Sequence, residues 1–209
     1  MTERKTALAK PRRKPVQSRS WQTSLAIQDA FVQLLVEDEY DRITIRDIVM
    51  VAGVALGSFY EYFTSKEELA RTCVHFRSKR ILKKLEQSRA EAAGLPLVQG
   101  IERAVLTLVD MVMDDHARWG QHFLLERRHS ALKQYRADYG RFTSQWKLLL
   151  EASEDWPIGR DAARPALTLS MLVYGALAHT AMSEDAKLDR GDVCEQLRLA
   201  AISYLAAWL

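Results

Sequence analysis

Residues 44–66 read TIRDIVMVAGVALGSFYEYFTSK, and this stretch decides the fold. Thr44 can cap the free backbone N–H groups of a helix, and Asp47, three residues later, completes a capping box. Gly53 follows the apolar residues of that helix, and glycine best tolerates the left-handed conformation of a tight turn. A second short helix is expected directly after the turn. The stretch therefore predicts a helix-turn-helix at about residues 44–63.

Longer helices are predicted on both sides of this motif. Upstream, apolar residues recur at the spacing of one buried helix face: Ile27, Ala30, Phe31, Leu34 and Leu35. Downstream, Ser65 and Glu68 form another capping-box signature, which starts a helix of about residues 65–90. The motif itself supplies the helix of about residues 55–62.

The rest of the chain also shows helical periodicity, and no alternation typical of strands occurs over a useful length. Five further helical segments are marked by their apolar residues: Ile101, Val105, Leu108 and Val112; Trp119, Phe123 and Leu124; Tyr135, Tyr139, Phe142, Trp146 and Leu149, ending near Trp156 and Pro157; Leu167, Met171, Tyr174, Ala178 and Ala181; and Leu197, Ala200, Ala201, Tyr204 and Trp208. The predicted fold class is all-α.

Basic residues are concentrated in residues 1–20, which hold seven Lys and Arg against one acid, a charge of 7 − 1 = +6. The whole chain carries +3, so the remainder carries 3 − 6 = −3. Pro11 and Pro15 are expected to keep this arm extended. A cationic arm on a mildly acidic body suits the neutralisation of phosphates, and a solubilising disordered tail fits equally well.

Length and composition exclude several classes of protein. At 209 residues the chain makes one or two domains. Cys73 and Cys194 lie far apart without a CxxC motif, so neither a zinc knuckle nor a disulfide framework is indicated. Residues 1–20 lack the apolar region of a secretory signal, and the longest apolar stretch, about residues 167–182, is shorter than a membrane span. A soluble, cytoplasmic protein is expected.

Catalytic signatures are also missing from the sequence. No HExxH, GxSxG, GxGxxG or Walker A run occurs, and the five histidines lack metal-ligand spacing. An enzyme would need a site assembled from distant residues. We therefore expect no catalysis, no metal and no cofactor.

The quoted stretch resembles the signature of the TetR/AcrR family of transcriptional regulators. The matching residues are Thr44, Ile48, Ala52, Gly53, Val54, Gly57, Tyr60, Phe63, Ser65 and Lys66. The resemblance covers about residues 21–81. It implies a basic arm (1–20), a helix-turn-helix domain (21–81) and a ligand-binding and dimerisation domain (82–209). It also implies a homodimeric repressor that a small molecule releases from a palindromic operator.

A recognition helix must present small or polar side chains to the major groove and to phosphates. The expected DNA contacts are Arg12, Arg13, Lys14, Thr44, Arg46, Ala55, Leu56, Gly57, Ser58, Tyr60, Tyr62 and Lys66. Tyr60 and Tyr62 are alternatively packed core aromatics, and Arg46 a solvated surface charge. Glu61 departs from the pattern, because a carboxylate near phosphates is unfavourable unless it accepts from cytosine.

For the domain of residues 82–209 the resemblance implies a ligand cavity and a four-helix dimer interface. Candidate cavity residues are Met111, Trp119, His122, Phe123, Tyr135, Tyr139, Trp146 and His179. Candidate interface residues are Tyr174, Ala178, Leu197, Ala201, Tyr204 and Trp208. For all of these, ordinary packing inside the core is the alternative.

A second function remains open at this point. The helical chain is alternatively a protein-interaction module whose helix-turn-helix contacts another protein and not DNA. The two hypotheses differ in salt dependence, because contacts to phosphates weaken steeply with added salt.

Overall fold

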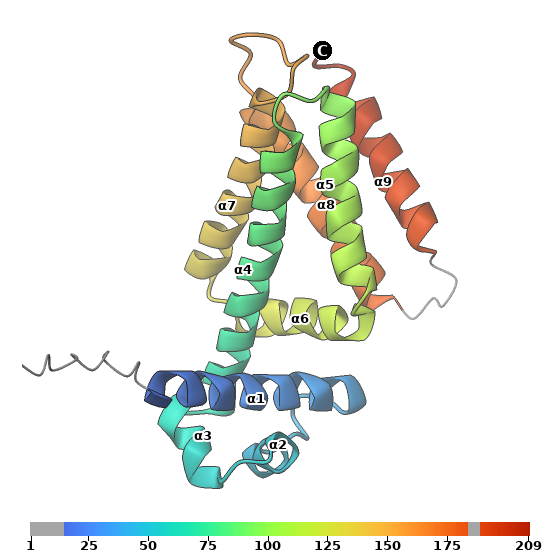
Figure 1. Cartoon of the computed structure of the whole chain (residues 1–209). Coiled ribbons are helices and arrows are strands. Elements are labelled where there is room, and N and C mark those ends of the chain that lie inside the picture. The colour runs from blue at the N-terminus through green and yellow to red at the C-terminus, as the bar shows by residue number, and fades with distance from the viewer. Residues whose placement is uncertain (1–14, 184–188) are drawn as a thin grey trace, which may run out of the picture.

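The computed structural model describes residues 15–183 and 189–209, and the regular structure in these residues is entirely helical (Figure 1). The helices are α1 (Pro15–Glu37), α2 (Ile45–Ala52), α3 (Leu56–Tyr62), α4 (Lys66–Ala92), α5 (Leu97–Met113), α6 (His116–His129), α7 (Leu132–Glu151), α8 (Ala163–Met182) and α9 (Arg190–Leu205). The predicted all-α fold class is confirmed.

Helices α1 to α3 form one end of the molecule, and α4 rises from them into an upright bundle with α5, α7, α8 and α9 (Figure 1). Helix α6 lies across the base of this bundle, close to α1 (Figure 1). The long helix α4 therefore joins the end that holds the helix-turn-helix to the rest of the molecule.

The buried apolar side chains form two cores that meet along α4. Val74 is the last α4 residue of the N-terminal core, and Ile81, two turns later, is the first of the C-terminal core. Leu125 of α6 also packs into the N-terminal core, although the other residues of that core all come from α1 to α4 and the loops between them. Helices α4 and α6 thus contribute to both cores.

Helix α6 lies unusually close to α8. A Cβ atom on Gly120 would be 2.4 Å from the backbone oxygen of Ala181, so only glycine fits there without a shift of backbone. One turn before Gly120, His116 Nε2 lies 2.7 Å from the backbone oxygen of Thr180. These two contacts fix the start of α6 against the end of α8.

Two expected element boundaries were wrong. Pro15 is the first residue of α1 and does not extend the arm, since a helix start needs no N–H from proline. The helix expected to end near Trp156 ends at Glu151.

Two of the apolar residues that marked α8 in the sequence lie on its outer side. Leu167 and Met171 are exposed, while Leu169, Val173 and Leu177 face the core. By length and composition α8 is the one helix among the described residues that could cross a membrane. Its packing against α5, α6, α7 and α9 makes it a core helix, and core helices commonly pass that test.

Candidate nucleic-acid interface

The start of α2 is fixed by a reciprocal cap. Thr44 Oγ1 accepts a hydrogen bond from the Asp47 N–H (3.2 Å), and the Asp47 carboxylate accepts from the Thr44 N–H (2.8 Å) and hydroxyl (2.6 Å). These bonds lower the pKa of Asp47. Gly53 ends α2 at φ 66°, in the left-handed region. The predicted capping box and glycine turn are confirmed.

The short helix α3 has a buried side and an exposed side. Phe59 and, just after the helix, Phe63 are buried in the N-terminal core, as expected. Tyr60 is 56% exposed and Leu56 42%, and they lie one turn apart on the outer side. A Cβ atom on Gly57 would meet no protein atom within 4 Å, so this part of the helix is open to a close approach from outside.

The remaining candidates on the helix-turn-helix divide by exposure. Arg46 and Ala55 are exposed, and Arg46 makes no ion pair among residues 15–183 and 189–209. Ser58 and Tyr62 are half-buried, and Tyr62 packs against the N-terminal core. Thr44 is exposed, but its hydroxyl is already used in the cap. Its backbone N–H also donates to the Asp47 carboxylate, so both of its donors are used within the cap.

Lys66 has a structural role that the sequence did not indicate. Its ammonium donates to the backbone oxygens of Tyr40 (2.7 Å) and Ile43 (2.6 Å) and lies 4.3 Å from the centre of the Tyr40 ring. Two of its three donors are therefore spent on the turn between α1 and α2, and its contact to DNA stays a prediction. Arg12, Arg13 and Lys14 lie outside the described residues.

Only half of the capping box predicted at Ser65 and Glu68 is present. Ser65 Oγ accepts from the Glu68 N–H (3.2 Å), as expected at the start of α4. The Glu68 carboxylate turns instead to Thr64 and accepts from its N–H (2.7 Å) and hydroxyl (2.5 Å). The loop between α3 and α4 is thus held by short-range bonds on both sides of Ser65.

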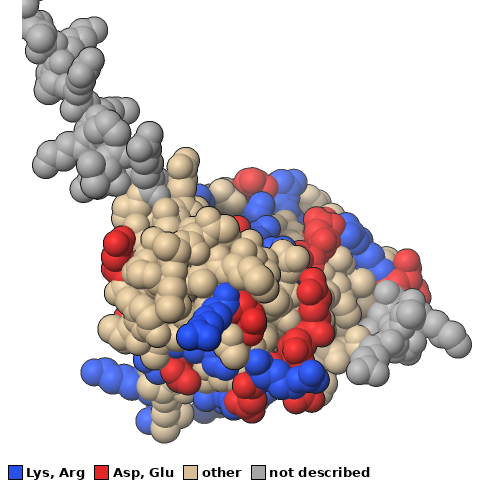
Figure 2. All heavy atoms as spheres, turned by 90° about the horizontal axis from the view of Figure 1, so that it is seen from below, with Lys and Arg blue, Asp and Glu red and all other residues tan. Residues whose placement is uncertain are grey.

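The face that carries α2 and α3 is largely uncharged, with Lys and Arg scattered over it and acidic side chains among them (Figure 2). The exposed apolar residues of these two helices are Met50, Val51, Leu56 and Tyr60. The described part of this face therefore offers groups for apolar and hydroxyl contacts more than a continuous basic patch.

Residues 27–73 match the family model described as bacterial regulatory proteins, tetR family. This segment is a tetR-family domain. The match covers the buried face of α1, the capped α2, the glycine turn, α3 and the start of α4. The predicted family resemblance is confirmed for this part of the chain.

Solved structures of transcriptional regulators resemble the fold over most of its length. A putative transcriptional regulator from Pseudomonas aeruginosa aligns with TM-score 0.70 and 18% identity, covering 94% of this chain and 93% of that one. A putative TetR-family regulator from Mesorhizobium loti gives 0.68 and 16%, covering 90% and 98%. FadR from Bacillus subtilis in complex with stearoyl-CoA gives 0.67 and 19%, covering 86% and 97%. A sequence comparison with curated proteins gives no match.

Most of the candidate ligand residues lie inside the core that follows the tetR-family domain. Met111, Trp119, His122, Phe123 and Trp146 are buried there. Tyr139 is half-buried. Tyr135 stacks on Tyr139 at 6.0 Å and is exposed, as is His179, so these two lie outside the core.

A small cavity of about 20 Å³ lies within this core. It is lined by Ile81, Leu85, Leu108, Phe142, Trp146, Ser170, Val173, Tyr174 and Leu177. Among the predicted candidates only Trp146 lines it. Phe142 was named with Trp146 in the same predicted helix, one turn earlier. Its spacing from Trp146 could have identified it as a second lining residue.

The candidate interface residues were mostly wrong, because they are packed within the protomer. Ala178, Leu197 and Ala201 are buried. The Tyr174 hydroxyl donates to the buried Glu126 carboxylate, and its ring packs edge-on against Phe123 at 5.4 Å.

Two further interface candidates, Tyr204 and Trp208, are half-buried. The Tyr204 hydroxyl bonds to Thr168 Oγ1 at 3.1 Å and therefore joins α9 to α8 within the chain. Only part of each ring is left for a partner.

The end of α6 contacts the tetR-family domain through Tyr40. The Arg128 guanidinium lies 4.4 Å from the centre of the Tyr40 ring, and the His129 ring lies 4.6 Å from it. Arg128 also pairs with Asp41 at 2.6 Å. Burial and the nearby Glu67 raise the pKa of Tyr40 to about 12. Arg128 and His129 thus join the end of α6 to the tetR-family domain.

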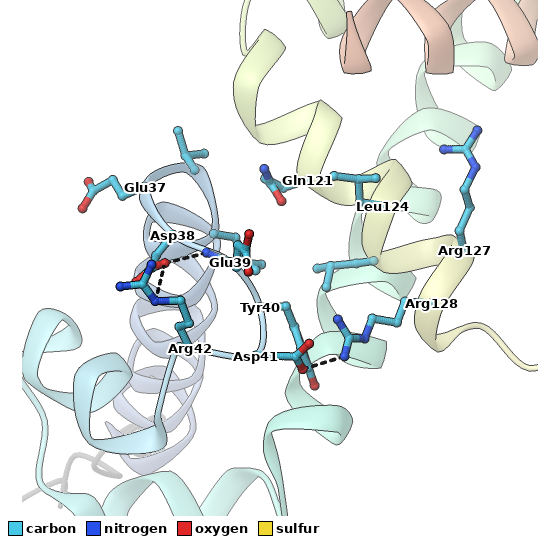
Figure 3. A pocket seen from close by; sticks show the side chains of 13 residues that line it. Glu37, Asp38, Glu39, Tyr40, Asp41, Arg42, Gln121, Leu124, Arg127 and Arg128 are labelled. Atoms are coloured by element: carbon cyan, nitrogen blue, oxygen red, sulfur yellow. Dashed lines mark hydrogen bonds and ion pairs between the residues drawn. The ribbon is translucent and has the colours of Figure 1, made fainter. Parts of the chain in front are cut away.

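An open groove of about 850 Å³ borders this contact. Figure 3 shows Glu37, Asp38, Glu39 and Arg42 on one side, and Gln121, Leu124 and Arg127 of α6 on the other. The Arg128–Asp41 pair crosses between the sides (Figure 3), and Asp38 pairs with Arg42 at 3.4 Å. Among the described residues no group of His, Cys, Asp and Glu could hold a metal ion.

Proposed function

We propose that this chain is a DNA-binding transcriptional regulator whose helix α3 enters the major groove. The observation that carries the proposal is the two-sided character of α3. Phe59 anchors the helix in the core, while Leu56, Gly57 and Tyr60 face outward. A rigidly held helix with small and hydroxyl-bearing residues on its outer side is suited to base edges and phosphates. The match to the tetR family supports this function.

A homodimer is part of the proposal, because one short helix reads too few base pairs to be specific. Two copies related by a two-fold axis read two half-sites of a palindrome. Exposed apolar side chains on the last two helices, among them Leu167 and Met171 of α8 and Leu199 of α9, are the surface we assign to the partner. These replace Ala178, Leu197 and Ala201, which the sequence had suggested and which are buried.

The basic residues 1–14 are proposed to contribute to DNA binding through their positive charge. Residues 1–14 carry six Lys and Arg against Glu3. Contacts between these side chains and phosphates would supply affinity that the largely uncharged face of α2 and α3 does not.

We further propose that a small-molecule effector, bound in the C-terminal core, controls DNA binding. FadR from Bacillus subtilis, which shares the fold, is described in complex with stearoyl-CoA. In the present chain, a small cavity beside Trp146 and Tyr174 lies in the C-terminal core. We expect ligand to act by binding one arrangement of the two domains more tightly than another, and release from a palindromic operator is the expected direction. A protein of this kind works in the cytoplasm.

Selection from a random duplex library tests the proposal. The expected result is enrichment of a two-fold symmetric sequence, with log affinity falling linearly as log salt rises. Deleting residues 1–14 should flatten that slope by about 0.9 for each phosphate that the arm neutralises. An affinity indifferent to salt, or no enriched sequence at low salt, would favour the protein-interaction module instead.

The Tyr60 hydroxyl gives a sharper test within α3. Tyr60→Phe should weaken binding to the selected duplex severalfold without altering stability, since the ring stays and only an exposed hydroxyl is removed. Tyr135→Phe is the matched control, because Tyr135 is also exposed but lies on α7. Equal affinities for both variants and the parent would remove Tyr60 from the interface.

A further inference from the structure

Three side chains near the junction of the two cores carry buried polar atoms that have no hydrogen-bond partner among the described residues. These atoms are Nδ1 and Nε2 of His122, Nε1 of Trp119 and Nη1 of Arg77. The His122 side chain is 2% exposed and Trp119 is fully buried. Leaving such a group unpaired costs about 1–3 kcal/mol, so an accumulation of them calls for a physical reason.

The three side chains form one cluster. The Arg77 guanidinium lies 5.0 Å from the centre of the Trp119 ring, and the Trp119 and His122 rings lie 5.3 Å apart at 85°. Arg77 Nη2 is 3.5 Å from an oxygen of Asp115, so one side of the guanidinium is paired while Nη1 is not. The cluster therefore joins α4 to α6.

The free groups are mostly donors. Arg77 Nη1 and Trp119 Nε1 can only donate. Burial, followed by the charge of Arg77, lowers the pKa of His122 to about 3, so its ring is neutral and offers one donor and one acceptor. Three donors, one of them on a cation, face one acceptor. A carboxylate satisfies such a set best, because its two oxygens accept several bonds and its charge matches the guanidinium.

The three side chains do not line the small cavity of the C-terminal core, but their neighbours line it or contact its lining. Ile81, one turn after Arg77 on α4, lines that cavity. On the other side, the Phe123 ring contacts both the His122 ring at 5.2 Å and the ring of Tyr174, a cavity residue, at 5.4 Å. An apolar group attached to a carboxylate at the cluster would thus be directed toward side chains that already border a gap in the packing.

We propose that Arg77, Trp119 and His122 bind the carboxylate of a small molecule whose apolar body enters an enlarged cavity beside Ile81 and Tyr174. This assignment rests on the proposed function, for which it names the chemical class of the effector. It also places the effector where it would influence the tetR-family domain. Val74 lies just before Arg77 and Leu125 just after His122, and both pack into the N-terminal core.

The test uses the full chain and two matched series of probes: straight-chain carboxylates from butyrate to palmitate, and the primary alcohols of the same lengths. Thermal unfolding and quenching of tryptophan fluorescence report binding. The expected result is that at least one acid raises the midpoint of unfolding and binds at least tenfold more tightly than its alcohol. Equal affinity for acid and alcohol, or no binding by any acid, overturns the proposal.

Substitution of His122 separates a binding role from a packing role. His122→Leu removes two unpaired polar atoms, so the free protein should become more stable while carboxylate affinity falls at least tenfold. Ser88→Ala is the matched control, since Ser88 is another buried α4 residue whose hydroxyl lacks a partner among the described residues. That control should bind the acid like the parent. A His122→Leu variant that is less stable and still binds the acid contradicts the assignment.

Binding of the selected duplex by the same preparations distinguishes the two proposals. Salt-dependent DNA binding without carboxylate binding overturns the carboxylate site alone. Carboxylate binding by a protein that ignores DNA at low salt overturns the regulator function and leaves the site standing.

Discussion

Gly57 lies on α3 where no other protein atom would touch a side chain. Alanine at this position should stabilise the folded protein by up to about 1 kcal/mol, because glycine is the poorer helix former. The same methyl group would project from the proposed DNA-reading side. We therefore expect Gly57→Ala to raise the midpoint of urea unfolding and to weaken DNA binding severalfold in a filter or anisotropy assay.

Gly140→Ala is the control for that prediction. Gly140 lies in α7 and is equally open, so the stability gain should be similar while DNA binding stays at the parental value. Unchanged DNA binding by Gly57→Ala would mean that backbone and duplex do not meet closely at this residue.

Lys66 illustrates a second kind of residue effect, in which a charged side chain holds two segments of the fold together. Lys66→Met should lower the free energy of unfolding by about 1–3 kcal/mol, because the carbonyls of Tyr40 and Ile43 lose their donor. Urea unfolding of Lys66→Met and of the exposed Lys79→Met measures this difference. Equal midpoints for the two variants would show that the ammonium contributes little to the fold.

The buried ring of His122 should also make stability depend on pH. Its pKa falls from the ordinary 6.5 to about 3 because of burial, so between these values the unfolded chain binds a proton that the folded chain does not. The free energy of unfolding should therefore decrease as the pH falls through this range. His122→Leu should show a shallower decrease, and the exposed His179→Leu should follow the parent. Parallel profiles for all three proteins would contradict this.

Hydrogen bonds between residues close together in the sequence could be predicted, and those between distant residues could not. Thr44 and Asp47 are three residues apart, and their cap was predicted with both hydrogen bonds. Lys66 bonds to carbonyls 23 and 26 residues away, and the Arg77, Trp119 and His122 cluster joins two separate helices. Such interactions follow from tertiary packing, which helical periodicity does not encode.

At the scale of elements, the predicted helices were correct where one face of the helix is polar. Helix α5 buries Ile101, Val105, Leu108 and Val112, as its stripe predicted. Helix α8 carries apolar residues all round, so its periodicity fits more than one orientation. Leu167 and Met171, which marked this helix in the sequence, are exposed in the structure.

The close crossing of α6 and α8 gives a prediction for these elements. Gly120→Ala would place a methyl group against the Ala181 carbonyl, so one helix has to shift, at a cost of about 1–3 kcal/mol. The shift should also alter DNA affinity, because α6 reaches the N-terminal core through Leu125. Thermal unfolding measures the cost. Gly175→Ala in α8, which meets no atom within 4 Å, is the control and should be stabilising.

At the scale of the whole molecule, the exposed side of α8 should decide the oligomeric state. Met171 is 59% exposed, and Met171→Glu would place a charge in the proposed dimer interface. The expected mass from light scattering is that of a dimer for the parent and of a monomer for this variant, with DNA binding abolished at the same time.

Leu106→Glu on α5 is the matched control, because Leu106 is similarly exposed outside the proposed interface. It should remain a dimer. A Met171→Glu protein that stays dimeric and binds DNA would move the interface elsewhere.

The packing of Leu125 into the N-terminal core limits how the helix-turn-helix end can be separated from the rest of the protein. Its side chain comes from α6 but completes the core formed mainly by residues 27–74. A fragment that ends after α4 would expose to water the apolar side chains that Leu125 covers, and it should tend to aggregate. A chimera with a foreign effector domain would need another apolar side chain at the same place. We therefore expect an exchange of domains to succeed when α6, or a helix with an equivalent apolar residue, is transferred together with residues 27–74.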